Sequence, residues 1–417
     1  MNHLEKFAVP VLMFMSLGST LAQESNDRPS NVAAPTEAQT VVVPARSHAA
    51  GNAQAVAFSR DGKLVAAGFG GPSSERFPLE PRGGGIAIWD VESGRRRHFI
   101  GEYGDILKLE FSHDGKSLAY ARVYTPGDSV DDDAVVVVDV ETGRIRHRWG
   151  NFRSGYQFLM LRPANQILVG RDVYELSDFS VVKPLDAFAP RCLAASVDGG
   201  RFAAIHQVEV PIIWPDGTVN PMARSLVMKG LALFDGTTFE KRASTESMEF
   251  AKSFALTVSP DGTTVVTGHS AGVARVWAGN PLAEVHRMET GFRGHVLPFF
   301  APDGRSLALA AQQTIAVRWK YDRTDTSGFE IRRDEPGAAS EVVFFDTKEW
   351  KETARWQLQD AAYTTYYYRG GRSDLHPECN PVRFAFSPDG TQILAGCNGV
   401  VLIDVPTGKI ARQFELK

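Results

Sequence analysis

Short apolar segments separated by polar turns recur from residue 51 to residue 417. In each unit one strand leads through a tight turn into a second apolar strand. A connection of variable length then leads to a third strand, which commonly ends in Asp, and to a polar fourth strand. Six of the tight turns contain Asp-Gly, at 61–62, 114–115, 198–199, 261–262, 303–304 and 389–390, and residues 162–165 hold the corresponding place in a seventh. Glycine accepts the positive φ that such hairpins require, which explains the recurrence.

The third strands give a second count of the units. They are predicted at 86–90, 135–139, 173–176, 231–235, 273–278, 342–346 and 400–404, which again makes seven. The segment VVVVD at 135–139 is apolar at consecutive positions, which indicates burial on both faces of the strand. Polar outer strands, such as RRRH at 95–98, protect the sheet edge. We therefore predict an all-β fold, a seven-bladed β-propeller of four-stranded antiparallel blades.

The segments FSRDG at 58–62 with IWD at 88–90, and VSPDG at 258–262 with VWA at 276–278, resemble the strand-turn and Trp-Asp signatures of the WD40-repeat family. Gly294-His295 matches its Gly-His dipeptide, and VVVVDVETGR at 135–144 is equally similar to the YVTN-type bacterial propellers. The resemblance covers residues 50–417 and implies an exported bacterial propeller with a scaffold role.

The N-terminal segment looks like an export signal. Residues 1–6 are polar, 7–17 are apolar but too few to span a bilayer, and Thr20-Leu21-Ala22 offers small residues for cleavage. Residues 23–50 are rich in Ala, Pro, Ser, Gln and Asn, so we expect a disordered linker in which 41–43 alone resembles a strand. The propeller then occupies 51–417, with its own last strand at 410–416, so 41–43 either adds an extra strand or stays loose. We expect an exported, periplasmic or extracellular protein without a membrane span.

Composition and charge narrow the classes of function. With 43% hydrophobic and 23% charged residues the chain is typical of globular proteins, and its formal net charge of -4 provides no basic field for nucleic acid. The cysteines Cys192, Cys379 and Cys397 match no metal spacing and are too few for a disulfide framework. Cys379 and Cys397 could pair in an oxidising compartment, but we favour the interpretation that all three are small buried hydrophobes.

Four patterns look chemical, and for each we favour a structural interpretation. GHSAG at 268–272 fits a nucleophile elbow but precedes a strand rather than a helix. DDD at 131–133 lacks the spaced oxygen ligands of a calcium loop, and GGG at 83–85 opens no helix that could hold phosphate. His206, His269 and His295 could converge at the channel as metal ligands or general bases. We predict no catalytic residues, no metal and no cofactor.

Loop length supplies the functional signal. Long connections are predicted at 70–85, 123–133, 207–229 and 321–340, between second and third strands, and at 361–381, between one blade and the next. In a propeller all five emerge on one face, and the tight hairpins occupy the other. Tyr, Trp and Arg are enriched at interface hot spots. The predicted protein-binding residues on these connections are Arg76, Arg82, Trp214, Arg332, Arg333, Tyr366, Tyr367, Tyr368, Arg369, Arg372 and His376.

These observations predict a monomeric, non-catalytic scaffold that binds a protein or peptide on its long-connection face. The competing hypothesis is a propeller enzyme, or a small-ligand or metal binder, that uses the channel mouth. A purely structural envelope component is a third hypothesis. An enzyme would bring three or more His, Asp or Glu side chains together at the channel, whereas a scaffold would display an apolar, aromatic patch across adjacent connections.

Overall fold

The computed structural model describes residues 39–43, 53–69, 84–102, 105–123, 134–150, 157–161, 164–185, 190–213, 218–246, 253–269, 272–292, 295–312, 339–360, 384–396 and 399–416. The chain divides into two units, Met1–Pro35 and Thr36–Lys417. The first unit, which contains the predicted export signal, lies outside the described residues.

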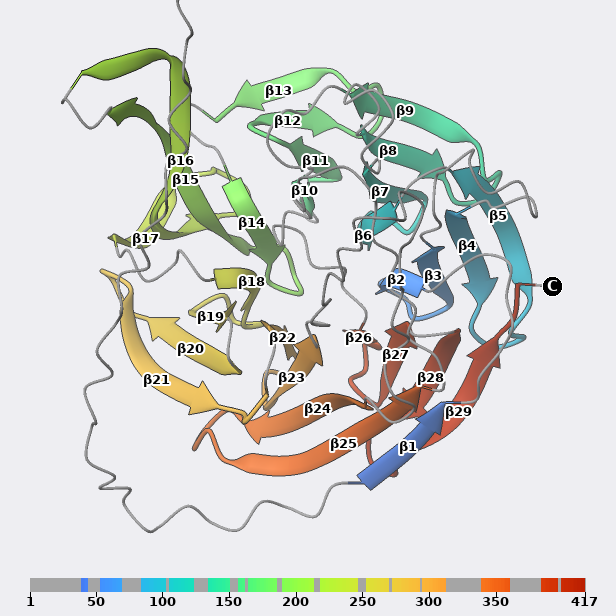
Figure 1. Ribbon diagram of the computed structural model, residues 1–417. Coiled ribbons are helices and arrows are strands. Elements are labelled where there is room, and N and C mark those ends of the chain that lie inside the picture. The colour runs from blue at the N-terminus through green and yellow to red at the C-terminus, as the bar shows by residue number, and fades with distance from the viewer. Residues whose placement is uncertain are drawn as a thin grey trace, which may run out of the picture. The chain divides into compact units, whose positions relative to one another are not determined.

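All described elements are β-strands, and they form seven sheets arranged in a ring (Figure 1). Blade 1 contains β2 (Ala53–Phe58), β3 (Leu64–Phe69), β4 (Gly84–Asp90) and β5 (Arg96–Glu102). Blade 2 contains β6 (Asp105–Phe111), β7 (Ser117–Val123), β8 (Ala134–Asp139) and β9 (Ile145–Gly150). Blade 3 contains β10 (Phe158–Leu161), β11 (Gln166–Val169), β12 (Asp172–Glu175) and β13 (Val181–Pro184). Blade 4 contains β14 (Pro190–Ala195), β15 (Arg201–Ile213), β16 (Val219–Asp235) and β17 (Lys241–Glu246).

Blade 5 contains β18 (Ser253–Val258), β19 (Thr264–His269), β20 (Val273–Ala278) and β21 (Ala283–Glu289). Blade 6 contains β22 (His295–Phe300), β23 (Ser306–Gln312), β24 (Ala339–Asp346) and β25 (Glu352–Asp360). Blade 7 contains β26 (Phe384–Phe386), β27 (Gln392–Gly396), β28 (Val400–Asp404) and β29 (Lys409–Phe414). Within each blade the four strands pair antiparallel in chain order, which confirms the predicted seven-bladed β-propeller. Each predicted third strand is the third strand of its blade.

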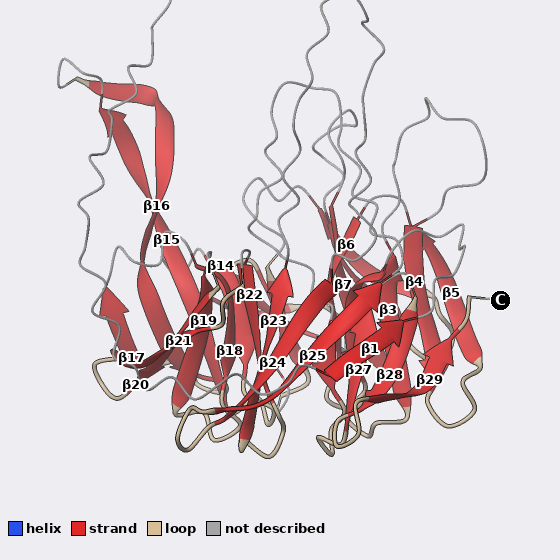
Figure 2. Ribbon diagram, turned by 60° about the horizontal axis from the view of Figure 1, so that its bottom comes forward, coloured by secondary structure: helices blue, strands red, loops and turns tan. Residues whose placement is uncertain are grey.

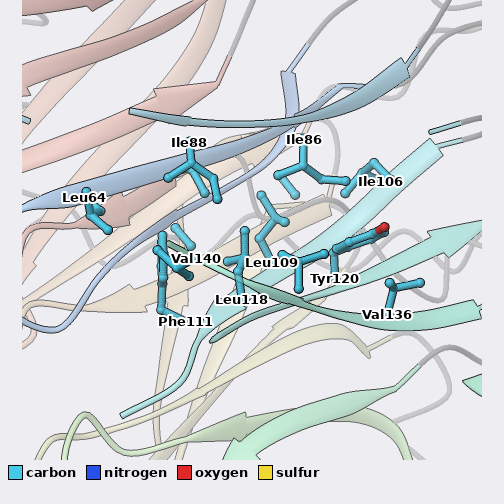
Figure 3. Close-up of a cluster of buried hydrophobic side chains, with 14 of the residues drawn as sticks. Leu64, Ile86, Ile88, Ile106, Leu109, Phe111, Leu118, Tyr120, Val136 and Val140 are labelled. Carbon is cyan, nitrogen blue, oxygen red and sulfur yellow. The ribbon is translucent and has the colours of Figure 1, made fainter. Parts of the chain in front are cut away.

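Burial on both faces of the inner strands has a simple geometric cause. Val136 and Val138 of β8 belong to the buried cluster between blades 1 and 2, whereas Val135 and Val137 belong to the cluster between blades 2 and 3 (Figure 3 shows the first). Alternate residues of one strand therefore serve two seams. Seven such clusters are present, one for each pair of neighbouring blades.

The ring closes between the last blade and the first. Trp89 of β4 is fully buried there, 5.7 Å from the ring of Phe414 and 6.3 Å from that of Phe69. Its indole Nε1 donates a hydrogen bond of 2.8 Å to the carbonyl oxygen of Glu415. The Arg96 side chain also donates to the carbonyl oxygen of Leu416. Closure therefore relies on side-chain packing and these hydrogen bonds, because blade 7 is built entirely from its own four strands.

Five of the six Asp-Gly turns, all but the one that begins with Ala301, share one hydrogen-bond pattern. Ser59 Oγ donates to Asp61 Oδ1 at 2.7 Å and accepts from the backbone N–H of Leu64 at 2.9 Å, while Gly62 adopts a φ of +69°. The same pattern recurs at the turns that begin with Ser112, Ser196, Ser259 and Ser387. In the seventh turn Asn165 takes the left-handed conformation, with a φ of +53°. The predicted chemistry of these turns is confirmed.

Blade 6 carries an additional outer strand. β1 (Gln39–Val43) pairs parallel with β25, from Gln39 opposite Trp356 to Val43 opposite Asp360 (Figure 1). It lies within the segment 23–50 that was expected to be a linker. Of the two predicted alternatives for 41–43, the structure therefore has the extra strand.

Candidate functional site

The two faces of the propeller differ in the length of their connections. Tight turns between first and second strands, and between third and fourth strands, lie on one face (Figure 2). Within blades, long connections join β3 to β4, β7 to β8 and β23 to β24, and the segment 207–229 extends β15 and β16 beyond their blade. The long connection between blades joins β25 to β26. Because strands alternate in direction, all five leave from the opposite face, as the sequence predicted.

The connection at 207–229 was expected to be a loop. It is instead a two-stranded antiparallel ribbon. It extends β15 and β16 beyond their blade and projects away from the tight-turn face (Figure 2). The pairing continues from Gln207 opposite Met228 to Ile213 opposite Val219. The neighbouring strands stop earlier, since β14 pairs with β15 only as far as His206 and β17 pairs with β16 only as far as Gly230. Beyond those residues no other described strand pairs with the ribbon.

The predicted protein-binding residues lie outside the described parts of the chain. They are Arg76, Arg82, Trp214, Arg332, Arg333, Tyr366, Tyr367, Tyr368, Arg369, Arg372 and His376. Cys379, Cys397 and Asp131–Asp133 also fall outside them, so the bridge and the acidic turn stay predictions. Cys192 is buried between blades 4 and 5, as the interpretation of a small buried hydrophobe requires.

A buried ionic cluster that sequence analysis missed lies at the seam between blades 1 and 2. Glu102, at the end of β5, has a side chain that is only 5% exposed and accepts three hydrogen bonds. Tyr120 Oη donates to Glu102 Oε1 at 2.5 Å, Arg148 Nη2 donates to the same oxygen at 3.1 Å, and Arg122 Nη1 donates to Oε2 at 3.0 Å. Burial, followed by the negative charge of Glu102, raises the pKa of Tyr120, so its phenol remains a donor.

This cluster anchors the strand ends from which the connections at 103–104 and 124–133 begin. Tyr120 and Arg122 lie at positions i and i+2 of β7, so both side chains reach the same seam. Tyr120, Arg122 and Arg148 all donate to the Glu102 carboxylate, and this mutual satisfaction of buried polar groups indicates a structural role. An arginine inside the otherwise apolar strand LAYARV at 118–123 was the available sequence signal.

A second ion pair joins two innermost strands. Lys108 Nζ lies 2.9 Å from Glu110 Oε1 on β6, and these side chains also bind the backbone of β10 in the next blade. Lys108 donates to the carbonyl oxygen of Phe158 at 2.6 Å, and the N–H of Met160 donates to Glu110 Oε2 at 2.7 Å. The pair thus satisfies backbone groups that an inner strand would otherwise leave unpaired.

His269 belongs to an internal hydrogen-bond chain of blade 5. The Trp277 indole donates to Thr267 Oγ1 at 2.8 Å, and the Thr267 hydroxyl lies 2.8 Å from His269 Nε2. A hydroxyl that accepts from the indole can donate its own proton to His269, so Thr267 links the two rings. Burial lowers the pKa of His269 to about 4, so the ring is neutral.

Two of the chemical patterns can be placed on this geometry. Within the described residues no group of three or more His, Cys, Asp or Glu side chains has the arrangement of a metal site. The side chains of His206 and His295 are outside the described set. The string at 268–272 begins within β19 and ends directly before β20, so a strand follows it where a nucleophile elbow has a helix.

Comparison with known proteins adds no relative. No family model matches the chain, and no curated protein matches it. The described part of the chain contains no helix long and apolar enough to cross a membrane.

Proposed function

We propose that this propeller is an exported, non-catalytic scaffold of the WD40/YVTN kind, which binds a protein or peptide on its long-connection face. The projecting ribbon at 207–229 carries the proposal. It is a paired structure that the blade does not need for its own sheet, because β14 pairs with β15 only as far as His206 and β17 pairs with β16 only as far as Gly230. The paired ribbon offers a partner backbone groups on its free edges and many side chains over a short length of chain.

The tight-turn face is less suited to bind a partner, which supports the choice of the long-connection face. The turns of the tight-turn face satisfy their own hydrogen-bonding groups, as at Ser59 and Asp61, and are too short to adapt to a partner. Interfaces that bind proteins bury about 800 Å² on each side, which a ribbon with four neighbouring connections can supply more readily than tight hairpins.

A photo-crosslinking experiment tests the proposal. A photoreactive residue is placed at Thr218, which is exposed on the ribbon, and as a matched control at Glu92, which is exposed on a tight turn. We expect adducts with a specific protein of the envelope fraction from position 218 and none from position 92. Adducts from both positions alike, or from neither, would contradict the choice of face.

The captured partner then permits a quantitative test. A variant in which Asn-Gly joins His206 directly to Gly230 should retain the fold and bind that partner about tenfold or more weakly, since hot-spot contacts dominate affinity. The control Glu92→Arg should bind as the parent does. Equal binding by the ribbonless variant refutes the role of the ribbon. If the chain instead takes up a metal or small ligand and no protein, the channel-mouth hypothesis replaces the scaffold.

A further inference from the structure

On the tight-turn face, every seam but one has at least one large side chain where the turn of one blade meets the outer strand of the preceding blade. In each blade the turn between third and fourth strands contains a residue that approaches the outer strand of the preceding blade. A Cβ atom at Gly143 would lie 2.9 Å from His98 Nδ1, and one at Gly94 would lie 2.7 Å from Arg412 Nη1. A small turn residue therefore faces a large residue of the neighbouring blade.

Three seams use an aromatic turn residue in place of glycine. Phe179, with a φ of +59°, stacks on His147 with ring centroids 4.5 Å apart. Trp350 in the same conformation stacks on His286 at 5.8 Å. Lys183 Nζ lies 5.4 Å from the centroid of the Phe239 ring, whose residue also has a positive φ. A left-handed conformation costs a bulky residue about 1–3 kcal/mol, so the packing at these seams must offset it.

The large residues of the outer strands share one register position. Each lies opposite the third-strand residue two before that strand's end. His98, His147, Lys183, His286 and Arg412 pair with Ile88, Val137, Val173, Val276 and Leu402. Between blades 4 and 5 the outer-strand residue is Ala243, and Leu282 of the next turn is buried in the same cluster. Six seams thus pair at least one large side chain with its neighbour.

The seam between blades 6 and 7 is the exception. The outer-strand position opposite Phe344 is Ala354, and the turn residue of blade 7 is Gly408, with a φ of +62°. Both residues are small. The side chain of Gln39 on β1 takes the missing place, because a Cβ atom at Gly408 would lie 2.5 Å from Gln39 Nε2. Gln39 Nε2 also donates a hydrogen bond of 2.7 Å to the carbonyl oxygen of Thr407.

β1 therefore contacts two blades at once. Its backbone pairs with β25 of blade 6, and its first side chain reaches the turn of blade 7. Residues 44–52 connect it to β2 in blade 1. A short tether gives a segment an effective concentration of about millimolar, so a strand of five residues can occupy such a site although it would bind weakly as a free peptide.

We propose that the outer edge of β25, together with the turn at Thr407 and Gly408 of blade 7, is a binding site for an extended segment. The segment runs parallel to β25 and begins with a residue whose side chain carries an amide. The chain's own residues 39–43 occupy the site and act as a separable latch on the seam between blades 6 and 7. This inference is independent of the proposed scaffold function.

Removal of residues 1–43 tests the latch by hydrogen exchange. We expect amides of β25 and of the turn at 405–408 to exchange about tenfold or more faster, with the other seams unchanged, because local opening is confined to the unlatched site. A synthetic peptide of residues 37–45 added in trans should restore protection. The same peptide with Gln39→Ala should restore less, since it lacks the side chain that contacts Gly408.

A second pair of variants separates the latch from a general effect of truncation. Ala354→His in the shortened chain reproduces the pairing of His98 with Gly143 and should recover part of the lost protection. In the full-length chain it should give no gain, because the Gln39 side chain already lies against Gly408. Should the shortened chain fail to fold, Val41→Pro with Val42→Pro in the full-length chain disrupts the strand instead. Unchanged exchange in β25, uniform loss over all seams, or equal rescue by both peptides would overturn the proposal.

Discussion

The buried carboxylate of Glu102 permits a quantitative prediction about the seam between blades 1 and 2. Its three donors differ in exposure, since the side chain of Arg122 is 8% exposed and that of Arg148 is 40% exposed. Glu102→Ala removes the only negative charge of the cluster while Arg122 remains buried. Breaking a buried ion pair by removing one partner costs about 3–5 kcal/mol.

Two further substitutions should cost less, for separate reasons. Tyr120→Phe keeps the ring in place and removes one hydrogen bond to a charged acceptor, which is worth about 1.5–3 kcal/mol. Arg148→Ala removes a largely solvated partner and should cost about 1 kcal/mol or less. The expected order of destabilisation is therefore Glu102→Ala, then Tyr120→Phe, then Arg148→Ala.

Thermal unfolding followed by circular dichroism measures this order. An unfolding entropy of about 2.1 cal/mol/K per residue, over 417 residues, makes each kcal/mol equivalent to about 1 °C in Tm. Glu102→Ala should then lower Tm by about 3–5 °C, and Arg148→Ala by about 1 °C or less. If Glu102→Ala unfolds within about 1 °C of the parent, or if Arg148→Ala is the most damaging change, the cluster does not stabilise this seam as argued.

Three other predictions concern single contacts. Trp89→Phe should cost about 1 kcal/mol or more in urea unfolding, because Glu415 loses its indole donor and the closing seam loses packed area; an unchanged midpoint would contradict the closure. The N–H of Ser93, then the Arg97 side chain, lowers the pKa of Asp90 to about 2. The ionised Asp90 carboxylate should therefore stabilise the folded state by about 1 kcal/mol above pH 4, and this contribution should vanish as the pH falls through 2. The free energies of unfolding of the parent and of Asp90→Asn should then converge in acid and differ at neutral pH. Asn165→Gly should raise Tm slightly, by the equivalent of about 0.5–1 kcal/mol, because the residue has a φ of +53°; a lower Tm would mean that its side chain stabilises the turn.

The repeating part of the fold was predictable because local chemistry and packing agree in every blade. The turn at Asp61-Gly62 requires a residue free to adopt positive φ, and the strand at 135–139 requires two apolar neighbours. Each requirement appears in a short stretch of sequence, and the positive φ of the turn recurs at glycine in six blades and at Asn165 in the seventh. The number of blades therefore followed from two independent patterns.

The ribbon was missed for a physical reason. Pro211 lies in the ribbon part of β15 and Pro221 in the ribbon part of β16. Proline in a sequence argues against a strand inside a sheet. In a ribbon of two strands each strand has one free edge, so a residue without an N–H can be accommodated. The argument from proline fails where no third strand is present.

The contacts between blades could not be predicted from one unit at a time. Glu102 and Arg148 come from different blades, and Gln39 meets Thr407 across 368 positions of the chain. The small size of Ala354 and Gly408 becomes informative only when register positions of all seven blades are compared. Sequence reasoning that treats each repeat alone has no access to this comparison.

The same seams explain why the long connections collect on one face. Turns on the tight-turn face contact the preceding blade, as Gly143 approaches His98 and a Cβ atom at Gly62 would lie 3.5 Å from Pro388 Cδ. An insertion there would break a seam, so packing alone directs insertions to the other face. The long-connection face therefore tolerates insertions for physical reasons. The difference in connection length between the two faces supports a recognition role less strongly than the ribbon does. A neutral insertion would not require its two halves to pair as strands. The residues of the ribbon do pair, from Gln207 opposite Met228 to Ile213 opposite Val219, and this ordered pairing favours a binding role.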